Sequence, residues 1–191
     1  MKTVLGDIRR ADEDFEMIAP GDRVAVGVSG GKDSLLLLYA LSLYRKFEHK
    51  NFELRGIMLD MGFEAFDASP VMRWCEELNI PFDVIQTDIA KVVFDLRKEN
   101  NPCSLCAKMR RGALNDAAKR LGCNKVALGH HREDAIETLM MSLIFEGRLH
   151  TFHPNIFLSG ADVTVIRPMV YVPEKHVIHV AKRLNLPVVH N

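Results

Sequence analysis

Three things are scarce in this chain of 191 residues: cysteine, net charge and long apolar runs. No apolar run approaches the length that crosses a membrane, and residues 1–10 lack the apolar core of a secretory signal peptide. The formal net charge is zero, so the overall balance indicates no nucleic-acid partner. The four cysteines stand in no secretory context, which favours the cytoplasm, where cysteine pairs more often bind metal or react than form structural disulfides.

The composition that is present fits one enzyme domain. Hydrophobic residues make up 48% and charged residues 26% of the chain, which is ordinary for a globular protein. A length of 191 residues lies within the range of one domain, and no internal repeat or long Gly/Ser linker divides it. We therefore expect a single domain over residues 1–191, with an N-terminal helical segment at about residues 7–18.

Segments with strand patterns alternate with segments of helical periodicity, which predicts an α/β fold. We expect a doubly wound, mostly parallel five-stranded sheet with helices on both faces. The expected strands are Arg23–Val28, Leu54–Asp60, Phe82–Thr87, Lys125–Gly129 and Val163–Arg167. The expected helices are Ser34–Phe47, Ser69–Leu78, Ser104–Leu121, Glu133–Phe145 and Pro173–Leu184. Ligands bind beyond the carboxyl ends of such strands, so residues 29–34, 59–61, 87–88 and 129–131 should meet in one crevice.

The segment Ser29-Gly30-Gly31-Lys32-Asp33-Ser34 lies where the first strand gives way to a helix. Two glycines allow a tight turn and close approach of the backbone to a ligand, and the helix directs unpaired N–H groups to the same place. Lys32 adds a positive charge, and the two serines add hydroxyl donors. The segment therefore predicts a phosphate site, although its spacing fits neither the Walker loop nor the dinucleotide fingerprint. The alternative is a simple glycine turn.

A second motif is the Cys103-Ser-Leu-Cys106 pair at the start of an expected helix. Two thiolates at this spacing suit zinc, an iron–sulfur cluster or a redox disulfide, but a tetrahedral site needs two further ligands. Two small residues at a helix start are the alternative interpretation. Cys75 and Cys123 are expected to be packed as small hydrophobic side chains.

A third segment runs from Gly129 to Asp134, from the end of a strand into a helix. Gly129 would allow close approach to adenosine or phosphate. Asp134 lies in the first helical turn, where it either favours the helix dipole or holds a Mg²⁺ ion that bridges ATP phosphates. His130 and His131 are candidates for phosphate contact, with a structural role as the alternative.

Positive charge is concentrated between Ala107 and Lys125, a segment that contains six basic residues and one acidic residue. A solvated helix face is the default interpretation of such a run, and an RNA-binding surface is the alternative. The flanks of Arg110 and Arg111 are the best candidates for that surface.

Taken together, these segments resemble the tRNA 2-thiocytidine synthetases among the PP-loop ATP pyrophosphatases. The resemblance covers nearly the whole chain. It rests on SGGKDS at 29–34, MLDMGF at 58–63, CSLC at 103–106 running into RRG at 110–112, ALGHHR at 127–132 with Asp134, and VIRPM at 165–169. A set of motifs in one order is far more specific than any single member.

The resemblance implies a cytoplasmic, often homodimeric enzyme that adenylates a tRNA pyrimidine oxygen and replaces it with sulfur. Such an enzyme uses ATP, Mg²⁺ and a [4Fe-4S] cluster, with sulfide or the persulfide of a cysteine desulfurase as sulfur donor. The implied assignments place Ser29, Gly30, Gly31, Lys32, Asp33 and Ser34 on pyrophosphate, Leu59 against adenine, Cys103 and Cys106 on the cluster, and Arg110, Gly129 and Asp134 around ATP and the reacting atoms. Lys32, Asp33, Cys103, Cys106, Arg110 and Asp134 are the expected catalytic residues.

One departure concerns the cluster. The family uses a third cysteine shortly after a strand resembling residues 187–190, and this chain stops at Asn191. We expect that the sequence is truncated shortly before that cysteine. The alternatives are that Cys75 or Cys123 substitutes for it, or that no stable cluster binds.

Rival functions remain open from the sequence. A tRNA uridine 2-thiolase and a tRNA lysidine synthetase share the PP-loop. A nucleotide- or cluster-binding sensor module is the rival outside the enzyme class.

Overall fold

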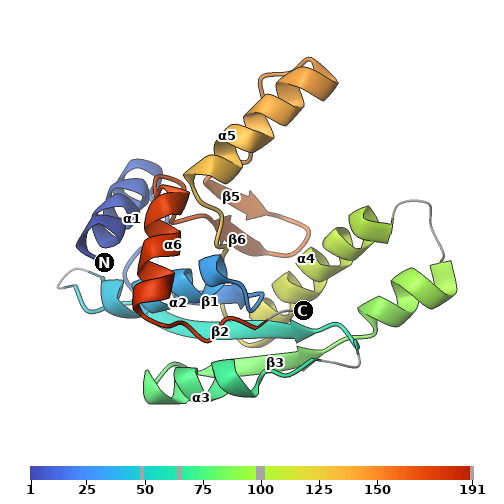
Figure 1. Ribbon diagram of the computed structural model, residues 1–191, viewed down its shortest axis with the longest axis horizontal. Coiled ribbons are helices and arrows are strands. Elements are labelled where there is room, and N and C mark those ends of the chain that lie inside the picture. The colour runs from blue at the N-terminus through green and yellow to red at the C-terminus, as the bar shows by residue number, and fades with distance from the viewer. Residues whose placement is uncertain (48–49, 64–65, 98–101, 190–191) are drawn as a thin grey trace.

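A six-stranded, mostly parallel sheet forms the centre of the protein (Figure 1). The structure is a computed structural model, and it describes the chain except residues 48–49, 64–65, 98–101 and 190–191. The strands are β1 (Arg23–Val28), β2 (Glu53–Asp60), β3 (Phe82–Gln86), β4 (Lys125–Ala127), β5 (Asn155–Leu158) and β6 (Val163–Ile166). Their order is β3-β2-β1-β4-β6-β5, and all neighbours are parallel except the antiparallel pair β5 and β6.

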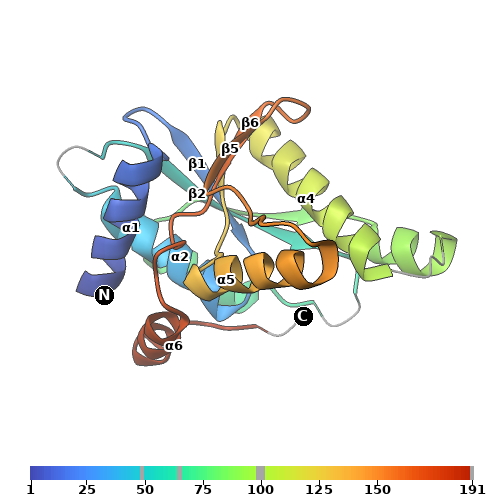
Figure 2. The same ribbon diagram turned by 90° about the horizontal axis from the view of Figure 1, so that it is seen from above.

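Helices cover both faces of the sheet, as predicted (Figure 2). Residues of α1, α2, α3 and α6 pack into one large hydrophobic core, and α4 packs into a second core on the other face. The helical segments are α1 (Lys2–Phe15), α2 (Lys32–Tyr44), α3 (Ser69–Glu77), η1 (Lys91–Arg97), α4 (Pro102–Arg120), α5 (Arg132–Met141), η2 (Ser142–Glu146) and α6 (Glu174–Arg183), of which η1 and η2 are π-helical.

Strand β1 shows how the sequence divides the two cores. Val24, Val26 and Val28 join the larger core and Ala25 joins the smaller one, because alternate side chains of a strand point to opposite faces. Gly27 also faces α4, where a Cβ atom would come within 2.6 Å of the Leu114 side chain. Small residues on this face of β1 therefore let α4 lie close to the sheet.

All five predicted strands are confirmed within two residues at each end, but the sheet has a sixth strand that we did not predict. Strand β5 is four residues long, half-exposed and joined to β6 by a turn at residues 159–162. Its Phe157 side chain is 60% exposed. Such a short edge strand buries too little on either face to give a clear alternating pattern.

Helix boundaries differ more from the prediction. The N-terminal helix spans residues 2–15 rather than 7–18, and it ends because Glu16 adopts the left-handed conformation at φ 49°. The helix predicted to reach residue 145 is α-helical only to Met141 and continues as η2. Segment η1 was not predicted. The strand-like segment expected at 187–190 is not a strand over residues 187–189, and His190 lies outside the described residues.

Parallel pairing brings the carboxyl ends of β1, β2, β3, β4 and β6 to one edge of the sheet. This edge carries the segments that the sequence singles out after β1, β2 and β4. None of the helices in the described parts of the chain is both long enough and apolar enough to cross a bilayer.

Candidate functional site

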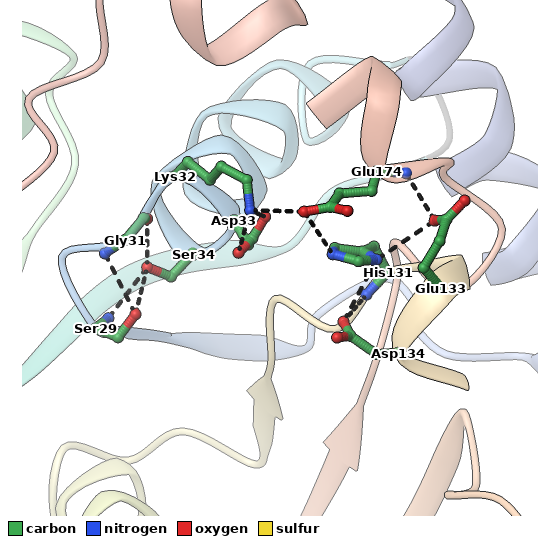
Figure 3. Close-up of polar contacts among 9 residues, drawn as sticks. All are labelled: Ser29, Gly31, Lys32, Asp33, Ser34, His131, Glu133, Asp134 and Glu174. Carbon is green, nitrogen blue, oxygen red and sulfur yellow. Dashed lines mark hydrogen bonds and ion pairs between the residues drawn. The ribbon is translucent and has the colours of Figure 1, made fainter. Parts of the chain in front are cut away.

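The segment at residues 29–34 forms the predicted turn from β1 into α2 (Figure 3). Gly30 has φ +86°, a left-handed conformation that strongly favours glycine, and Gly31 is the N-cap residue of α2. The Ser34 hydroxyl donates to the Gly31 carbonyl at 3.0 Å and accepts from the Ser29 N–H at 3.1 Å. Ser34 thus folds the loop back onto the start of the helix, where N–H groups and the positive dipole end face the same place.

The chain near its last described residues lies across this loop. The Val189 N–H donates to the Gly30 carbonyl at 3.0 Å. A Cβ atom on Gly30 would overlap Val189 Cγ2 and come within 3.2 Å of Met58 Cε. At Gly31 the nearest atom to such a Cβ is Ser29 Oγ at 3.5 Å, an ordinary contact. Gly30 is therefore required by the fold, whereas the fold leaves room for a side chain at Gly31.

Lys32 lies between two carboxylates. Its Nζ atom is 3.0 Å from Asp33 Oδ1 and 3.2 Å from Glu174 Oε1 (Figure 3). Burial by itself would lower the pKa of Lys32, but the hydrogen bonds and charges of Asp33 and Glu174 outweigh burial and raise it. Lys32 is thus held as a cation beside the loop. Glu174 was not predicted as a site residue, because an acidic residue in the first turn of a helix is usually explained by its favourable interaction with the helix dipole.

The start of α5 is built around Asp134, which was predicted to line the site. Its Oδ2 atom accepts the His131 N–H at 2.7 Å and so caps the helix. His131 is only 6% exposed, and its Nε2 atom is 3.9 Å from Glu174 Oε1. The Glu174 N–H donates to Glu133 Oε2 at 2.7 Å. These contacts fix the N-terminal ends of α5 and α6 against each other beside Lys32.

Gly129 lies directly against the first turn of α2. A Cβ atom there would come within 3.0 Å of the Ser34 nitrogen and 3.1 Å of the Asp33 carbonyl carbon. Close packing of two backbones therefore accounts for Gly129, and its predicted contact with a ligand stays a prediction. Leu59, predicted beside adenine, is half-buried near the carboxyl end of β2, the strand next to β1.

Helix α4 begins beyond the carboxyl end of β2. Cys103, Cys106 and Arg110 share one face of this helix, because they stand three and four residues apart. Cys106 and Met109 pack against a small apolar cluster that includes Met61, the residue after β2. Cys103 and Arg110 are exposed. The CxxC pair therefore lies at the same edge of the sheet as the loop after β1.

Cys75 and Cys123 are buried in the two main cores, as predicted. Burial raises the pKa of both thiols, that of Cys75 to about 12. Neither therefore suits the role of a third cluster ligand beside Cys103 and Cys106, and Asn191 lies outside the described residues. Within the part of the chain that the structure describes, no three His, Cys, Asp or Glu side chains are grouped to hold a metal ion.

A surface hollow of about 590 Å³ lies elsewhere, at the amino ends of β1 and β2, where Arg23, Glu53 and Cys123 line it. None of the predicted site residues lines it. Since ligands of parallel α/β sheets bind at the carboxyl ends, we place the functional site at the loop and not in this hollow.

Comparison with known proteins identifies the family of this chain. A family model described as a PP-loop domain matches residues 7–190. The tRNA-cytidine(32) 2-sulfurtransferase of Citrifermentans bemidjiense is 39% identical over 183 residues, which cover 95% of this chain and 72% of that protein. This chain belongs to the PP-loop tRNA-cytidine 2-sulfurtransferase family. A second member, from Geobacter sulfurreducens, is 38% identical over 98% of this chain and 74% of its own length.

Solved structures of other proteins share the fold of this chain. The U34-tRNA thiolase NcsA from Methanococcus maripaludis, solved with its [4Fe-4S] cluster, has a TM-score of 0.77 and 29% identity, over 96% of this chain and 64% of that one. The NH3-dependent NAD synthetase of Campylobacter jejuni has a TM-score of 0.58 at 18% identity, over 97% of this chain and 73% of that one, and so shows the fold alone. The overall fold is thus shared by proteins with different chemistries.

The two loop glycines give a direct test of the phosphate site. We expect Gly30→Ala to lower the free energy of unfolding by at least about 1–2 kcal/mol, because alanine is strained at positive φ and Val189 blocks its Cβ. We expect Gly31→Ala to unfold like the wild type in urea but to bind ATP at least about tenfold more weakly, because its methyl group keeps a phosphate from the backbone. Unchanged ATP affinity in calorimetry of Gly31→Ala would contradict phosphate binding at this turn.

Proposed function

We propose that this protein is an ATP-dependent tRNA sulfurtransferase that makes 2-thiocytidine in the cytoplasm, at the tRNA position that its relatives' names give as 32. The observation that carries the proposal is that a PP-loop after β1 and a CxxC pair at the start of α4 lie at one edge of the sheet. Replacement of oxygen by sulfur needs both an activated oxygen and a sulfur-handling group nearby. The two motifs fit these two requirements.

Adenylation is needed because the 2-oxygen of cytidine is a poor leaving group, whereas AMP is a good one. In the first step this oxygen attacks the α-phosphorus of ATP, and pyrophosphate departs with the electrons of the broken P–O bond. In the second step a sulfur nucleophile attacks C2 of the base, and the C2–O bond breaks. AMP then leaves with the former base oxygen, so each turnover yields AMP, pyrophosphate and one thiocytidine.

The loop residues would stabilise the departing pyrophosphate. The N–H groups at the start of α2 are suitable donors to phosphate oxygens, and the hydroxyls of Ser29 and Ser34 would join them by exchanging hydrogen bonds that they make within the loop. Lys32 is held as a cation by Asp33 and Glu174, within reach of the same loop. A polyphosphate would compete with these carboxylates for Lys32, so the positive charge is available where negative charge develops.

Mg²⁺ would complete the charge balance of ATP. This ion typically takes one or two carboxylates together with phosphate oxygens and water rather than a cage of protein ligands. Asp134 is partly exposed at the start of α5, and we propose that it contributes such a carboxylate. Its second function is structural, since the same side chain caps the helix.

Arg110 and the CxxC pair would serve the sulfur step. Arg110 is exposed on the face of α4 that carries Cys103 and Cys106, so its charge would stabilise an incoming sulfur anion or the departing AMP. Two thiolates at this spacing fit two corners of a [4Fe-4S] cluster. Such a cluster, when bound, supplies a site for the sulfur atom. Sulfide would be the source directly, or the persulfide of a cysteine desulfurase would be the source together with a reducing thiol, which supplies the two electrons that release the outer sulfur as sulfide.

The function is tested with the purified chain under anaerobic conditions, with iron and sulfide for reconstitution, ATP, Mg²⁺, lysine and unmodified tRNA. Nucleoside mass spectrometry should find thiocytidine, and Lys32→Gln should slow pyrophosphate release about a hundredfold or more. Lys175→Gln, an exposed lysine on α6, is the matched control and should behave like the wild type. Lysidine or thiouridine as product would replace our proposal with a sister function, and ATP binding without any product would indicate a sensor module.

The cluster is tested by its content rather than by activity. We expect Cys103→Ala and Cys106→Ala to lower bound iron and acid-labile sulfide at least about tenfold after reconstitution, because each removes a ligand. Cys123→Ala removes a buried thiol beyond the opposite end of α4 from the CxxC pair and should leave both contents unchanged. Equal iron in all three variants would contradict cluster binding by the CxxC pair.

A homodimer is the assembly that we propose. Helix α5 has no buried residue, and with η2 it extends away from the sheet (Figure 1). Seven large apolar residues on and beside this arm are 43% to 81% exposed. They are Ile136, Met140, Met141, Leu143, Ile144, Phe145 and Leu149. At about 200 Å² for each fully exposed residue, they present roughly 800 Å², which matches one side of a standard interface and exceeds the usual patch on a monomer.

The dimer is tested by placing a charge in this arm. We expect Met141→Asp to raise the dimer dissociation constant at least about a hundredfold in sedimentation equilibrium, because an unpaired carboxylate would be buried at the interface. Met72→Asp, a matched change at a 40% exposed methionine on α3, should not alter it. A wild-type chain that sediments as a monomer at every concentration would contradict the proposal.

A further inference from the structure

Two side chains lie close together beyond the ends of neighbouring strands, and neither has a role in the reaction proposed above. His130 follows β4 and Arg167 follows β6, and these strands pair in parallel, so both residues lie at the same edge of the sheet as the loop. Phe152 lies beside both: the Arg167 guanidinium is 4.7 Å from its ring centroid, and the His130 ring is 5.1 Å away. The aromatic ring thus fixes a cation and an imidazole at one place.

Arg167 has fewer partners than its guanidinium needs. One Nη atom donates to the His153 carbonyl at 2.5 Å, while the Nε atom is buried without a hydrogen-bond partner. None of the ion pairs between described residues includes Arg167. The Nδ1 atom of His130 is also buried and unpartnered. Arg167 is half-buried, and a guanidinium with a buried, unpartnered Nε atom and no anion beside it is unfavourable, so this arrangement calls for an anionic ligand.

A second guanidinium, that of Arg111, strengthens the case for an anionic ligand beside Arg167. Arg111 of α4 is exposed, and the hydrogen bond that its Nε atom makes is a long one, at 3.4 Å to the carbonyl of Ala107 in its own helix. Burial lowers the pKa of Arg167, and the positive charge of Arg111 lowers it further. Burial likewise lowers the pKa of His130, and the charges of Arg167 and Arg111 lower it further, while the Asp134 carboxylate acts in the opposite direction. Two like charges that lie close enough to repel each other are stabilised together by a shared anion.

The strand order argues against the phosphates of ATP as that anion. The loop follows β1, and Leu59, our proposed adenine contact, lies on β2. Strand β6 lies two strands from β1 on the opposite side, roughly 10 Å away at the usual strand spacing. ATP that extends from β2 to the loop therefore leaves Arg167 for another anionic group. In the proposed function the other polyanion is tRNA.

We propose that Arg167 and Arg111 bind a backbone phosphate of tRNA beside the cytidine that is modified. This inference rests on the proposed function, and it gives the site a way to position the RNA that does not depend on the loop. A guanidinium fork suits a phosphate group because it donates two parallel hydrogen bonds. The stack on Phe152 holds the plane of Arg167 in one orientation before the RNA arrives.

The test measures the affinity of an unmodified tRNA transcript by fluorescence anisotropy over a series of salt concentrations. We expect Arg167→Gln to weaken tRNA binding about tenfold or more, because one phosphate contact is lost. For the same reason the salt slope, which is the slope of the logarithm of the binding constant against the logarithm of the salt concentration, should fall in magnitude by about 1. Arg167→Lys should keep most of the slope but lose part of the affinity, since it retains the charge without the fork. Arg183→Gln removes an exposed arginine of α6 as the matched control and should bind within about twofold of the wild type.

Arg111→Gln is the second variant, because an exposed residue can be changed without disturbing the core that Arg167 touches. It should also reduce the slope, and the double variant should lose less than the product of the two single losses. A slope of Arg167→Gln equal to that of Arg183→Gln, or a fall in ATP affinity with unchanged tRNA affinity, would overturn the inference. If the wild type makes thiocytidine, these results overturn the phosphate subsite alone. A wild type that binds no tRNA at any salt concentration overturns both the subsite and the proposed function.

Discussion

The reversal of the chain between β1 and α2 is the constraint on which the site depends. Gly30 must adopt a left-handed conformation there, and neighbouring backbone must come close from two sides: Val189 across Gly30, and Gly129 against Asp33 and Ser34. Because these contacts involve main chain, no rearrangement of side chains can replace them. The loop is therefore held rigid before any ligand binds, which reduces the ordering entropy that phosphate binding must overcome.

Much of the fold could be predicted because hydrophobic burial determines it locally. The five strands with strong apolar patterns were found within two residues, since their side chains enter cores that leave little choice of register. Strand β5 and segment η1 were missed for the opposite reason, whereas η2 was predicted as helix but not as a π-helix. Both missed segments are short and partly exposed, so their own residues carry no clear period.

The residues of the candidate site were predicted or missed for similar reasons. Motifs that are contiguous in sequence, such as residues 29–34 and the CxxC pair, were recognised because their chemistry depends on local spacing. Glu174 could not be found, since its meeting with Lys32 depends on how α6 packs beside α2. Arg167 and Phe152 are a similar case, because their stacking joins β6 to the segment before β5. Gly129 was recognised as a residue that allows close approach, and the structure shows that it lies close to the backbone of Asp33 and Ser34.

The ion pair between Lys32 and Glu174 connects nucleotide occupancy to helix α6. A polyphosphate that draws Lys32 toward itself leaves Glu174 without a cationic partner, and Glu174 also anchors the start of α6 to Glu133. Binding of a polyphosphate at the loop therefore changes how strongly α6 is held in its present position. Thermodynamic linkage makes this coupling reciprocal, so anything that shifts α6 alters the affinity of the loop by the same factor. Helix α6 leads into the segment that crosses Gly30, so a change in the position of α6 would also reach the chain that lies over the loop.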